Sequence, residues 1–293
     1  MKILITGGSG ALGSELNKSL SLNNQILSIY NSNIGNCDIY NSIQTDITDK
    51  EKLKTIFAKF RPDIVVHTAA ISNPVIVDKI SSKKVYATNV TAVKNIAELC
   101  DKYNSKLIYT STDLVYAGYR GTMLNENSKL VPISLYAETK LMGEVKIKET
   151  FNNYLILRMS LMFGIGKFYK NNHFNKMYQN LINEKNVSLF TDQYRTPISF
   201  KEAALMISQL VKINVKESTI NFGGKEKVSR FEKGVMLCEE AGLNKSLLLP
   251  VTMKDVNAAY QVKDVSMNTE KLCSFGIEQK SLHEMIRSEL SSI

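Results

Sequence analysis

The sequence predicts an α/β fold in which a doubly wound parallel sheet is interleaved with a smaller, mostly helical C-terminal lobe. Short apolar runs alternate with helical patterns through the first half of the chain, and the links between them are short. This alternation favours parallel strands joined by right-handed crossovers. A glycine-rich turn also connects the first strand to the first helix. The 293 residues, 44% of them apolar, are sufficient for a full core.

The first strand is predicted over residues 2–6, and a turn that contains three glycines leads directly into a helix. Glycine lets the backbone turn tightly, lets a pyrophosphate approach the main chain and lets the helix pack closely on the sheet. The free amides at the helix start attract anions. We interpret the segment as a Rossmann-type dinucleotide site, with a purely structural turn as the alternative. Its expected cofactor contacts are Gly7, Gly10, Ala11, Leu12 and Gly13.

Further strands of the first half are predicted from runs of apolar and β-branched residues. They span residues 25–30, 64–67, 107–110 and 155–158. The helix between the first two of these is expected to begin at a capping box formed by Thr48 and Glu51 and to end at Arg61, before Pro62.

The regular alternation loosens after residue 158, although another strand is predicted over 219–222. Helices are expected where Ser199, Ser229 and Ser281 are each followed three residues later by a glutamate, the pattern of a capping box. We predict a dinucleotide-binding domain over 1–165, to which about 187–215 returns. A substrate-binding lobe is predicted over 166–186 and about 216–293.

Composition excludes several classes of function. The four cysteines are far apart and form no CxxC pair, which indicates free thiols in a reducing cytoplasm and predicts no metal site. The formal charge is +9, but the lysines are scattered and lack interleaved aromatic residues, so nucleic acid is not an expected partner. No apolar run approaches the roughly 18 residues of a membrane helix, so no membrane partner is expected.

Tyr136 and Lys140 form a Tyr-x-x-x-Lys pair on a predicted helix, where side chains four positions apart share a face. A nearby cation favours the phenolate and is expected to lower the pKa of the tyrosine, which prepares it for proton transfer. Thr112 lies where the strand over 107–110 ends, at the sheet edge that binds ligands in open parallel sheets. We expect Thr112 to hydrogen-bond the oxygen that exchanges a proton with Tyr136. Lys140 can also anchor a nicotinamide ribose, and a surface pair is the alternative interpretation.

Together these motifs make the chain resemble the extended short-chain dehydrogenase/reductase family and, within it, the dTDP-4-dehydrorhamnose reductase group. The resemblance covers nearly the whole length, and Thr112 precedes Tyr136 by 24 residues, a spacing that the group shares. The matching positions are Thr6 to Gly13, Asp46-Ile47, Arg61 to Asp63, Thr68 to Ala70, Asn89-Val90, Ser111 to Asp113, Val115-Tyr116, Lys140, Gly143-Glu144, Arg158, Asp192-Gln193, Thr196-Pro197 and Asn221 to Gly224.

The resemblance implies that Asp46 and Ile47 contact the adenine and that Ala69 and Ala70 lie along the cofactor phosphates. It also implies that Asn89 is a structural and proton-relay residue beside the catalytic threonine, tyrosine and lysine, with a contact to the cofactor. Judged from the residues alone, Asp46 could cap a turn and Asn89 could cap a helix. These purely structural interpretations stay open as alternatives.

The substrate contacts that the resemblance implies include several departures from the group. Leu161 replaces an aromatic residue that is usual in the rhamnose group, which argues against rhamnose itself. Leu114 replaces the glutamate of the related dehydratases, which argues against dehydration. Arg195 stands where the group often has glycine, and its planar fork is suited to a diphosphate. Asp113 and Gln193 complete the expected substrate contacts.

The cofactor preference is predicted from the end of the second strand, at Asn31. Strict NAD enzymes place an acidic residue there for the ribose hydroxyls. Residues 30–33 contain no acidic side chain that would repel a 2′-phosphate. They also contain no basic side chain that would bind it strongly. We predict a preference for NADP(H), or dual use of NAD(P)(H).

The sequence thus predicts NAD(P)H-dependent reduction of the C4 ketone of a nucleotide-activated 4-keto-6-deoxysugar. The resemblance alone implies a role in surface polysaccharide synthesis. A nucleotide-sugar 4-epimerase with tightly bound NAD is one alternative. A non-catalytic, cofactor-binding regulatory subunit, like the β subunit of methionine adenosyltransferase, is another. The expected partner is a nucleotide-diphosphate sugar, and a homo-oligomer stays open.

Overall fold

The computed structural model describes residues 1–72, 77, 79–116, 118, 121–166, 172–256 and 261–291. The chain divides into two compact units that alternate along the sequence. Unit 1 comprises Met1–Val115, Pro132–Arg158 and Ala204–Ile220, and unit 2 comprises Tyr116–Val131, Met159–Ala203 and Asn221–Ile293. The functional domains expected from the sequence stay a prediction, and their segment 166–186 includes residues 167–171, which lie outside the described part.

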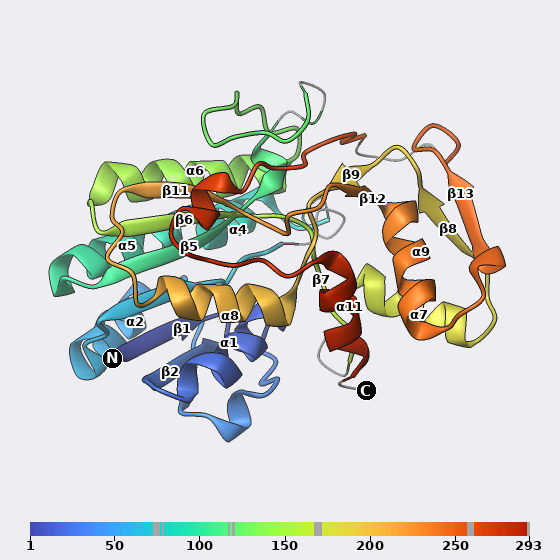
Figure 1. Ribbon diagram of the computed structural model, residues 1–293. Helices are drawn as coiled ribbons and strands as arrows, with labels where there is room; N and C mark the ends of the chain where they lie inside the picture. The colour runs from blue at the N-terminus through green and yellow to red at the C-terminus, as the bar shows by residue number, and fades with distance from the viewer. Residues whose placement is uncertain are drawn as a thin grey trace. The chain divides into compact units, whose positions relative to one another are not determined.

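Unit 1 is built around a seven-stranded sheet with the order β11-β6-β5-β4-β1-β2-β3 (Figure 1). The register is parallel for β1 with β2 and β4, for β2 with β3 and for β4 with β5. The strands are β1 (Lys2–Thr6), β2 (Gln25–Tyr30), β3 (Ser42–Gln44), β4 (Ile64–His67), β5 (Lys106–Thr112), β6 (Tyr154–Met159) and β11 (Ser218–Phe222). The predicted doubly wound sheet is confirmed, with β3 as an unpredicted edge strand. Strand order reverses between β1 and β4, the position at which such sheets bind ligands.

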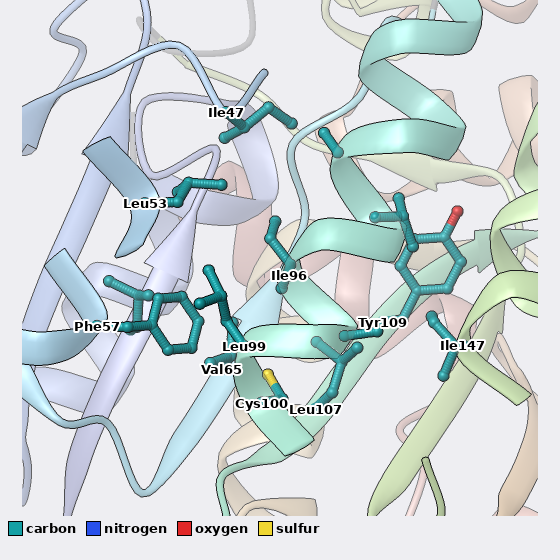
Figure 2. Close-up of a cluster of buried hydrophobic side chains, with 14 of the residues drawn as sticks. Ile47, Leu53, Phe57, Val65, Ile96, Leu99, Cys100, Leu107, Tyr109 and Ile147 are labelled. Carbon is teal, nitrogen blue, oxygen red and sulfur yellow. The ribbon is translucent and has the colours of Figure 1, made fainter. Parts of the chain in front are cut away.

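Helices cover this sheet, and Figure 2 shows the core beneath α2, α5 and α6. Alternate side chains of a strand point to opposite faces, so Leu4 of β1 joins this core and Ile3 does not. The packing fixes β5 against α5 and α6. The helical elements of unit 1 are α1 (Ala11–Ser21), η1 (Cys37–Ile39), α2 (Lys50–Phe60), α4 (Ser82–Tyr86), the π-helical turn η2 (Ala87–Thr91), α5 (Ala92–Tyr103), η3 (Asp113–Val115), α6 (Leu135–Thr150) and most of α8 (Phe200–Leu210).

Unit 2 contains helices and three two-stranded ladders, in which β10 pairs with β7, β12 with β9 and β13 with β8. Its strands are β7 (Met162–Phe163), β8 (Val187–Phe190), β9 (Tyr194–Arg195), β10 (Ile198–Ser199), β12 (Val228–Ser229) and β13 (Leu248–Val251). Its helices are α7 (His173–Ile182), α9 (Arg230–Ala241), η5 (Lys245–Leu247), α10 (Glu270–Cys273) and α11 (Leu282–Leu290).

Most predicted helix starts are present. The Ser199 hydroxyl accepts from the Glu202 amide at 3.1 Å, but the Ser199 amide donates to the sulfur of Met285 at 3.5 Å, so only half of that predicted box forms. Both capping boxes of unit 2, at Ser229 and Ser281, are present. The predicted box at Thr48 is wrong, because α2 begins one residue later: the carboxylate of Asp49 accepts from the Lys52 amide at 3.0 Å. Thr48 is instead held by Asp46. Within the described part of the chain, no helix is long and apolar enough to cross a membrane.

Candidate active site

The turn between β1 and α1 is shaped by glycine. Gly7 has a φ of 73°, and its carbonyl accepts from the Gly10 amide at 2.9 Å. A Cβ atom on Gly13 would lie 2.1 Å from that carbonyl oxygen, so only glycine lets α1 start this close to β1. Gly10 caps α1 without a side chain, which leaves the first-turn amides, including those of Ala11 and Leu12, to face an anion. The turn therefore fits a phosphate group.

The loop after β4 lies against this turn. The amide and the hydroxyl of Thr68 both donate to the carbonyl of Thr6, at 3.2 and 2.8 Å. A Cβ atom on Gly7 would lie 2.8 Å from the Ala69 nitrogen. Ala69 and Ala70, the predicted phosphate contacts, come directly after Thr68 in the chain. Thr68 is the residue that is hydrogen-bonded to the strand before the glycine turn.

Asn89 is fully buried in η2, where it joins this loop to α6. Its side-chain oxygen accepts from the Ile71 amide at 2.9 Å, and its side-chain nitrogen donates to the Ile71 carbonyl at 3.1 Å. The same nitrogen lies 3.1 Å from the Thr139 hydroxyl. These bonds give Asn89 a clear structural function, in place of the simple helix cap that the residues alone suggested.

Thr112 and Tyr136 come together at the carboxyl end of β5. Tyr136 is half-buried in the first turn of α6, which Ser134 caps, and the Thr112 hydroxyl lies close enough to lower the pKa of its phenol. The Thr112 hydroxyl also donates to Asp113 at 3.2 Å and accepts from the Leu114 amide at 3.2 Å. The predicted threonine and tyrosine thus lie near one another at this end of the strand.

Lys140 lies one turn further along α6 and is 2% exposed. Its ammonium nitrogen lies 4.1 Å from the centre of the Tyr109 ring, on β5. The Tyr109 hydroxyl in turn donates to the Lys140 carbonyl at 3.3 Å. A Cβ atom on Gly143 would lie 2.4 Å from that hydroxyl oxygen, so glycine at this position makes room for the tyrosine. Tyr109 was not singled out from the sequence, because its buried strand gave no sign of a polar role.

The pKa of Tyr136 is raised, contrary to the lowered value expected from the sequence. Burial raises it most, the negative charge of Asp113 adds to this, and the neighbouring Thr112 hydroxyl lowers it. The pKa of Lys140 is lowered to about 7 by burial, against the opposing effect of Glu144. The expectation was wrong because it counted the cation four positions away and not the burial of both groups.

A buried ion pair holds together the helix and strands that carry these residues. Arg158 of β6 lies 2.9 Å from the Glu144 carboxylate of α6, and both side chains are at most 2% exposed. Ser111 of β5 donates to the same carboxylate at 2.6 Å. The resemblance noted from the sequence included these positions, and the structure gives them a physical function in holding α6 to β5 and β6.

His67, at the end of β4, is fully buried, as expected for a core histidine. Its Nδ1 atom hydrogen-bonds the Thr6 hydroxyl at 2.5 Å, and its ring stacks on Tyr109. Its Nε2 atom has no partner among the described residues. Burial, and secondarily the charge of Lys140, lower the pKa of His67 to about 3, so the ring is neutral.

The predicted adenine and ribose contacts follow the strands at the other side of β1. Asn31 is exposed directly after β2, and Asp46 is exposed after β3. The Asp46 carboxylate accepts from the amide and hydroxyl of Thr48 at 2.9 and 2.8 Å, the turn cap that the residues alone suggested. Ile47 is buried in the core of Figure 2.

The predicted substrate contacts Leu161, Gln193 and Arg195 belong to unit 2. The carbonyl of Leu161 accepts from the Ile198 amide at 3.2 Å. Arg195 donates to the Tyr194 and Val262 carbonyls at 2.6 and 3.3 Å. Gln193 accepts from Arg230 at 2.8 Å.

Two basic residues of α9, Arg230 and Lys233, lie near this group but were not predicted. Arg195 and Arg230 are close enough to Lys233 to lower its pKa. Their only sequence signal is a basic first turn of a helix, where the helix dipole disfavours cations. In the described part of the chain, no group of three or more histidine, cysteine, aspartate or glutamate side chains is arranged to hold a metal ion.

The chain is similar to known proteins over most of its length. A family model described as "RmlD substrate binding domain" matches residues 1–292. The chain is 27% identical over 255 residues to a dTDP-4-dehydrorhamnose reductase of Aggregatibacter actinomycetemcomitans, covering 84% of this chain and 81% of that protein. It is 25% identical over 289 residues to methionine adenosyltransferase 2 subunit beta of Pongo abelii, covering 96% and 84%. The crystal structure of a dTDP-4-dehydrorhamnose reductase from Bacillus anthracis in complex with NADP has a TM-score of 0.85 at 25% identity, covering 100% of this chain and 99% of that one.

Proposed function

The chain belongs to the RmlD substrate binding domain family, and from this premise we propose that it is an NAD(P)H-dependent reductase. Its proposed substrate is the C4 ketone of a nucleotide-activated 4-keto-6-deoxysugar. The observation that carries the proposal is the proximity of Thr112 to Tyr136, whose pKa it lowers, with Lys140 buried one turn further along the same helix. A tyrosine, a hydroxyl and an ammonium at the carboxyl end of a parallel strand are suited to proton exchange with a carbonyl oxygen.

The cofactor is proposed to bind the glycine turn, whose close backbone approach and free helix amides fit a pyrophosphate. When bound, NAD(P)H supplies the hydride for the C4 carbon. The proposed contacts are Gly7, Gly10, Ala11, Leu12, Gly13, Asn31, Asp46, Ile47, Ala69, Ala70, Asn89, Tyr136 and Lys140. Because Asn31 is neutral and exposed, NADP(H) or dual use is retained as the proposal, and the NADP in the Bacillus anthracis enzyme supports it.

Tyr136 supplies the proton to the C4 oxygen in this mechanism. A reduction needs the protonated phenol, and the raised pKa of Tyr136 keeps the proton in place until a charged oxygen develops beside it. Thr112 orients that oxygen through its hydroxyl. In this proposal the ammonium of Lys140, one turn further along α6, stabilises the phenolate that remains, because an opposite charge favours the ionised form. Asn89 holds the loop that follows β4 against α6.

The nucleotide-diphosphate sugar is proposed to contact Asp113, Leu161, Gln193 and Arg195. The buried guanidinium of Arg195 supports this, since planar guanidinium groups recognise phosphate oxygens. We place the product in surface polysaccharide synthesis, a role that only the family resemblance of the sequence implies. We place the protein in the cytoplasm, which suits its free cysteines, three of them buried.

The decisive experiment incubates the purified protein with NADPH or NADH and a panel of 4-keto-6-deoxysugar nucleotides while cofactor absorbance is followed. We expect oxidation of NADPH with at least one sugar, and a loss of about 100-fold or more in kcat for Tyr136→Phe. Equal turnover of Tyr136→Phe and the parent would exclude the assigned acid. Better turnover with NADH would reverse the cofactor preference.

Two other functions give different results in the same assay. A 4-epimerase keeps its NAD bound and shows no net oxidation of the cofactor. A regulatory subunit, as the similarity to methionine adenosyltransferase 2 subunit beta suggests, binds cofactor without turnover and co-purifies with a synthetase. The proximity of Thr112 to Tyr136 supports the reductase over the non-catalytic alternative.

A further inference from the structure

His67 carries a buried nitrogen that the proposed chemistry does not use. The side chain is fully buried at the end of β4, and its Nδ1 atom hydrogen-bonds the Thr6 hydroxyl at 2.5 Å. Its Nε2 atom is buried as well and has no partner among the described residues. A buried polar atom without a partner costs free energy, so its presence in the middle of a sheet calls for an explanation.

The register of the sheet places His67 between the glycine turn and Lys140. Thr6 of β1 and Tyr109 of β5 are its partners on the two neighbouring strands, so the three residues form one row across the sheet. The His67 ring stacks on the Tyr109 ring, with 5.7 Å between the ring centres and 20° between the ring planes. At the other end of the row, Thr6 comes directly before Gly7.

Lys140 lies against the same aromatic ring as His67. Its ammonium nitrogen is 4.1 Å from the centre of the Tyr109 ring, and its charge reaches His67, whose pKa it lowers. The face of an aromatic ring attracts an ammonium group but offers no lone pair of the kind that N–H donors seek. A buried ammonium therefore gains from a further acceptor, and the unpartnered Nε2 atom of His67 is one beside the shared ring.

The neighbours of the imidazole decide which nitrogen can act in this way. Burial and the charge of Lys140 keep the ring neutral, so one nitrogen carries a hydrogen and the other an unshared electron pair. If the Thr6 oxygen accepts from Nδ1–H, the electron pair is on Nε2. The opposite arrangement would put an N–H group at Nε2 near a cation, and the two positive ends would repel. The surroundings thus favour the hydrogen on Nδ1.

We propose that His67 is a positioning residue for Lys140, whose ammonium is attracted by the electron pair on Nε2 and is so held against Tyr109. The proposal rests on the proposed function for the use to which the ammonium is put, whereas the attraction depends on the geometry of unit 1. A neutral imidazole adds no charge of its own. It therefore orients the lysine without competing with it for the phenolate of Tyr136.

Other titratable groups near this row come from β5, η3 and α6. They are Tyr109, Asp113, Tyr136 and Glu144. Glu144 favours the charged form of Lys140, and burial keeps Tyr109 protonated by raising its pKa. A replacement of His67 leaves all four in place, so a difference between the parent and such a variant reports on the imidazole.

The first test needs neither cofactor nor sugar. The full chain contains three histidines, so labelling them with nitrogen-15 gives few imidazole signals, and the pair that His67→Phe removes belongs to His67. Nitrogen-15 shifts show which nitrogen carries the hydrogen. We expect a neutral ring with the hydrogen on Nδ1 from about pH 5.5 to about pH 9.

The same spectra test the contact with the lysine. The Nε2 signal should shift as Lys140 loses its proton at about pH 7, and Lys140→Met should abolish that shift. A hydrogen on Nε2, or an Nε2 signal that does not respond to the charge of Lys140, overturns the proposal. Both measurements use proteins in which His67 itself is unchanged.

The second test compares three replacements of His67 in the NADPH assay. Glutamine can place a polar atom where Nε2 was, asparagine can do so only for Nδ1, and phenylalanine keeps only the stacking on Tyr109. His67→Gln should retain kcat within about threefold of the parent. His67→Asn and His67→Phe should each lose about 10-fold or more in kcat, with the KM of the sugar nearly unchanged. Equal losses in all three variants, or an unchanged kcat in His67→Phe, would refute the role of Nε2.

The pH profile separates positioning from a general structural effect. The proposed mechanism needs the charged lysine, so kcat should decline as pH rises through the pKa of Lys140. The electron pair on Nε2 favours the charged form, and its loss lowers that pKa. The decline should therefore begin about one pH unit lower in His67→Phe than in the parent, and His67→Gln should restore it. A profile that is the same in His67→Phe and the parent speaks against the proposal.

His283→Gln is the matched control, because His283 lies in unit 2 on α11, paired with Glu240 at 2.9 Å. It should change neither the Nε2 signal of His67 nor kcat, and the Tm of each variant shows whether it folds. If no ketosugar is reduced while Nε2 responds to Lys140, the reductase function fails and the contact of His67 with Lys140 stands. If the parent is active while Nε2 does not respond, the role of His67 fails and the reductase function stands.

Discussion

The ammonium nitrogen of Lys140 lies 4.1 Å from the centre of the Tyr109 ring, so a residue of β5 supports the cation of α6 that the proposed chemistry requires. Both groups are buried, and Gly143 leaves the space that the tyrosine hydroxyl occupies. The position of the lysine is thus determined by the sheet as well as by its own helix.

Removing the ring should impair catalysis more than removing its hydroxyl. A desolvated cation–π contact contributes about 2 kcal/mol, so Tyr109→Leu is expected to lower kcat by roughly 10- to 30-fold. Tyr109→Phe keeps the ring and should stay within about threefold of the parent. Steady-state rates of both variants, with their Tm values as a control for folding, test this. Equal losses in the two variants would show that the hydroxyl, and not the ring, positions Lys140.

The burial of Lys140 makes stability depend on pH. Its pKa is about 7 in the folded protein, compared with about 10.4 in an unfolded chain. Between these values the unfolded chain binds more protons, so this lysine makes the protein more stable as pH rises from about 7 towards 10. At lower pH the folded protein carries the buried charge and its full cost.

Lys140→Met removes this dependence. The variant's free energy of unfolding should exceed that of the parent most at about pH 6, and the excess should shrink by about pH 9. Urea unfolding at the two pH values measures it. A difference that stays constant with pH would mean that Lys140 does not titrate in this range.

In the glycine turn, alanine should be tolerated better at Gly10 than at Gly13. A Cβ atom on Gly13 would lie 2.1 Å from the Gly7 carbonyl oxygen, whereas one on Gly10 would lie 3.2 Å from the same oxygen. We expect Gly13→Ala to weaken NADPH binding by about 100-fold or more, because the start of α1 must shift, and Gly10→Ala to weaken it less. Fluorescence titration with NADPH measures both. A larger loss of NADPH affinity for Gly10→Ala than for Gly13→Ala would contradict the assignment of the glycine turn as the cofactor-binding site.

The ion pair of Glu144 and Arg158 should show strong coupling. Glu144→Gln leaves the guanidinium buried without its counter-charge, so we expect a loss of about 3–5 kcal/mol in the free energy of unfolding. The double variant Glu144→Leu/Arg158→Met removes both charges and should be more stable than Glu144→Gln. Chemical denaturation of the parent and the two variants gives the comparison, and a double variant less stable than Glu144→Gln would contradict the prediction.

Most of the fold was predictable because short parallel strands leave a strong apolar pattern. Every strand expected in the first half is present, and β3 was missed because its three residues are exposed or half-buried and carry no such pattern. The misplaced cap of α2 has a similar origin: Thr48 and Asp49 are both good capping residues, and only the backbone geometry distinguishes them.

The elements that carry the candidate residues were predictable, but their electrostatics were not. The sequence placed Thr112 at the end of a strand and Tyr136 with Lys140 on one helix, and their assignment to a site stays a proposal. The pKa of Tyr136 was expected to move the other way, because burial is a tertiary property that spacing along a helix does not report. The contacts of Tyr109 and His67 likewise depend on elements distant in the sequence.

The alternation of the two units along the chain has a consequence for biosynthesis. Unit 1 is completed only by its last segment, Ala204–Ile220, which contributes most of β11 at the edge of the sheet. A nascent chain that has emerged as far as β6 therefore lacks that border strand, and β6 has an open edge until roughly two hundred residues have left the ribosome. Neither unit corresponds to a contiguous fragment that could be expressed alone. A truncation meant to isolate one of them would cut through both.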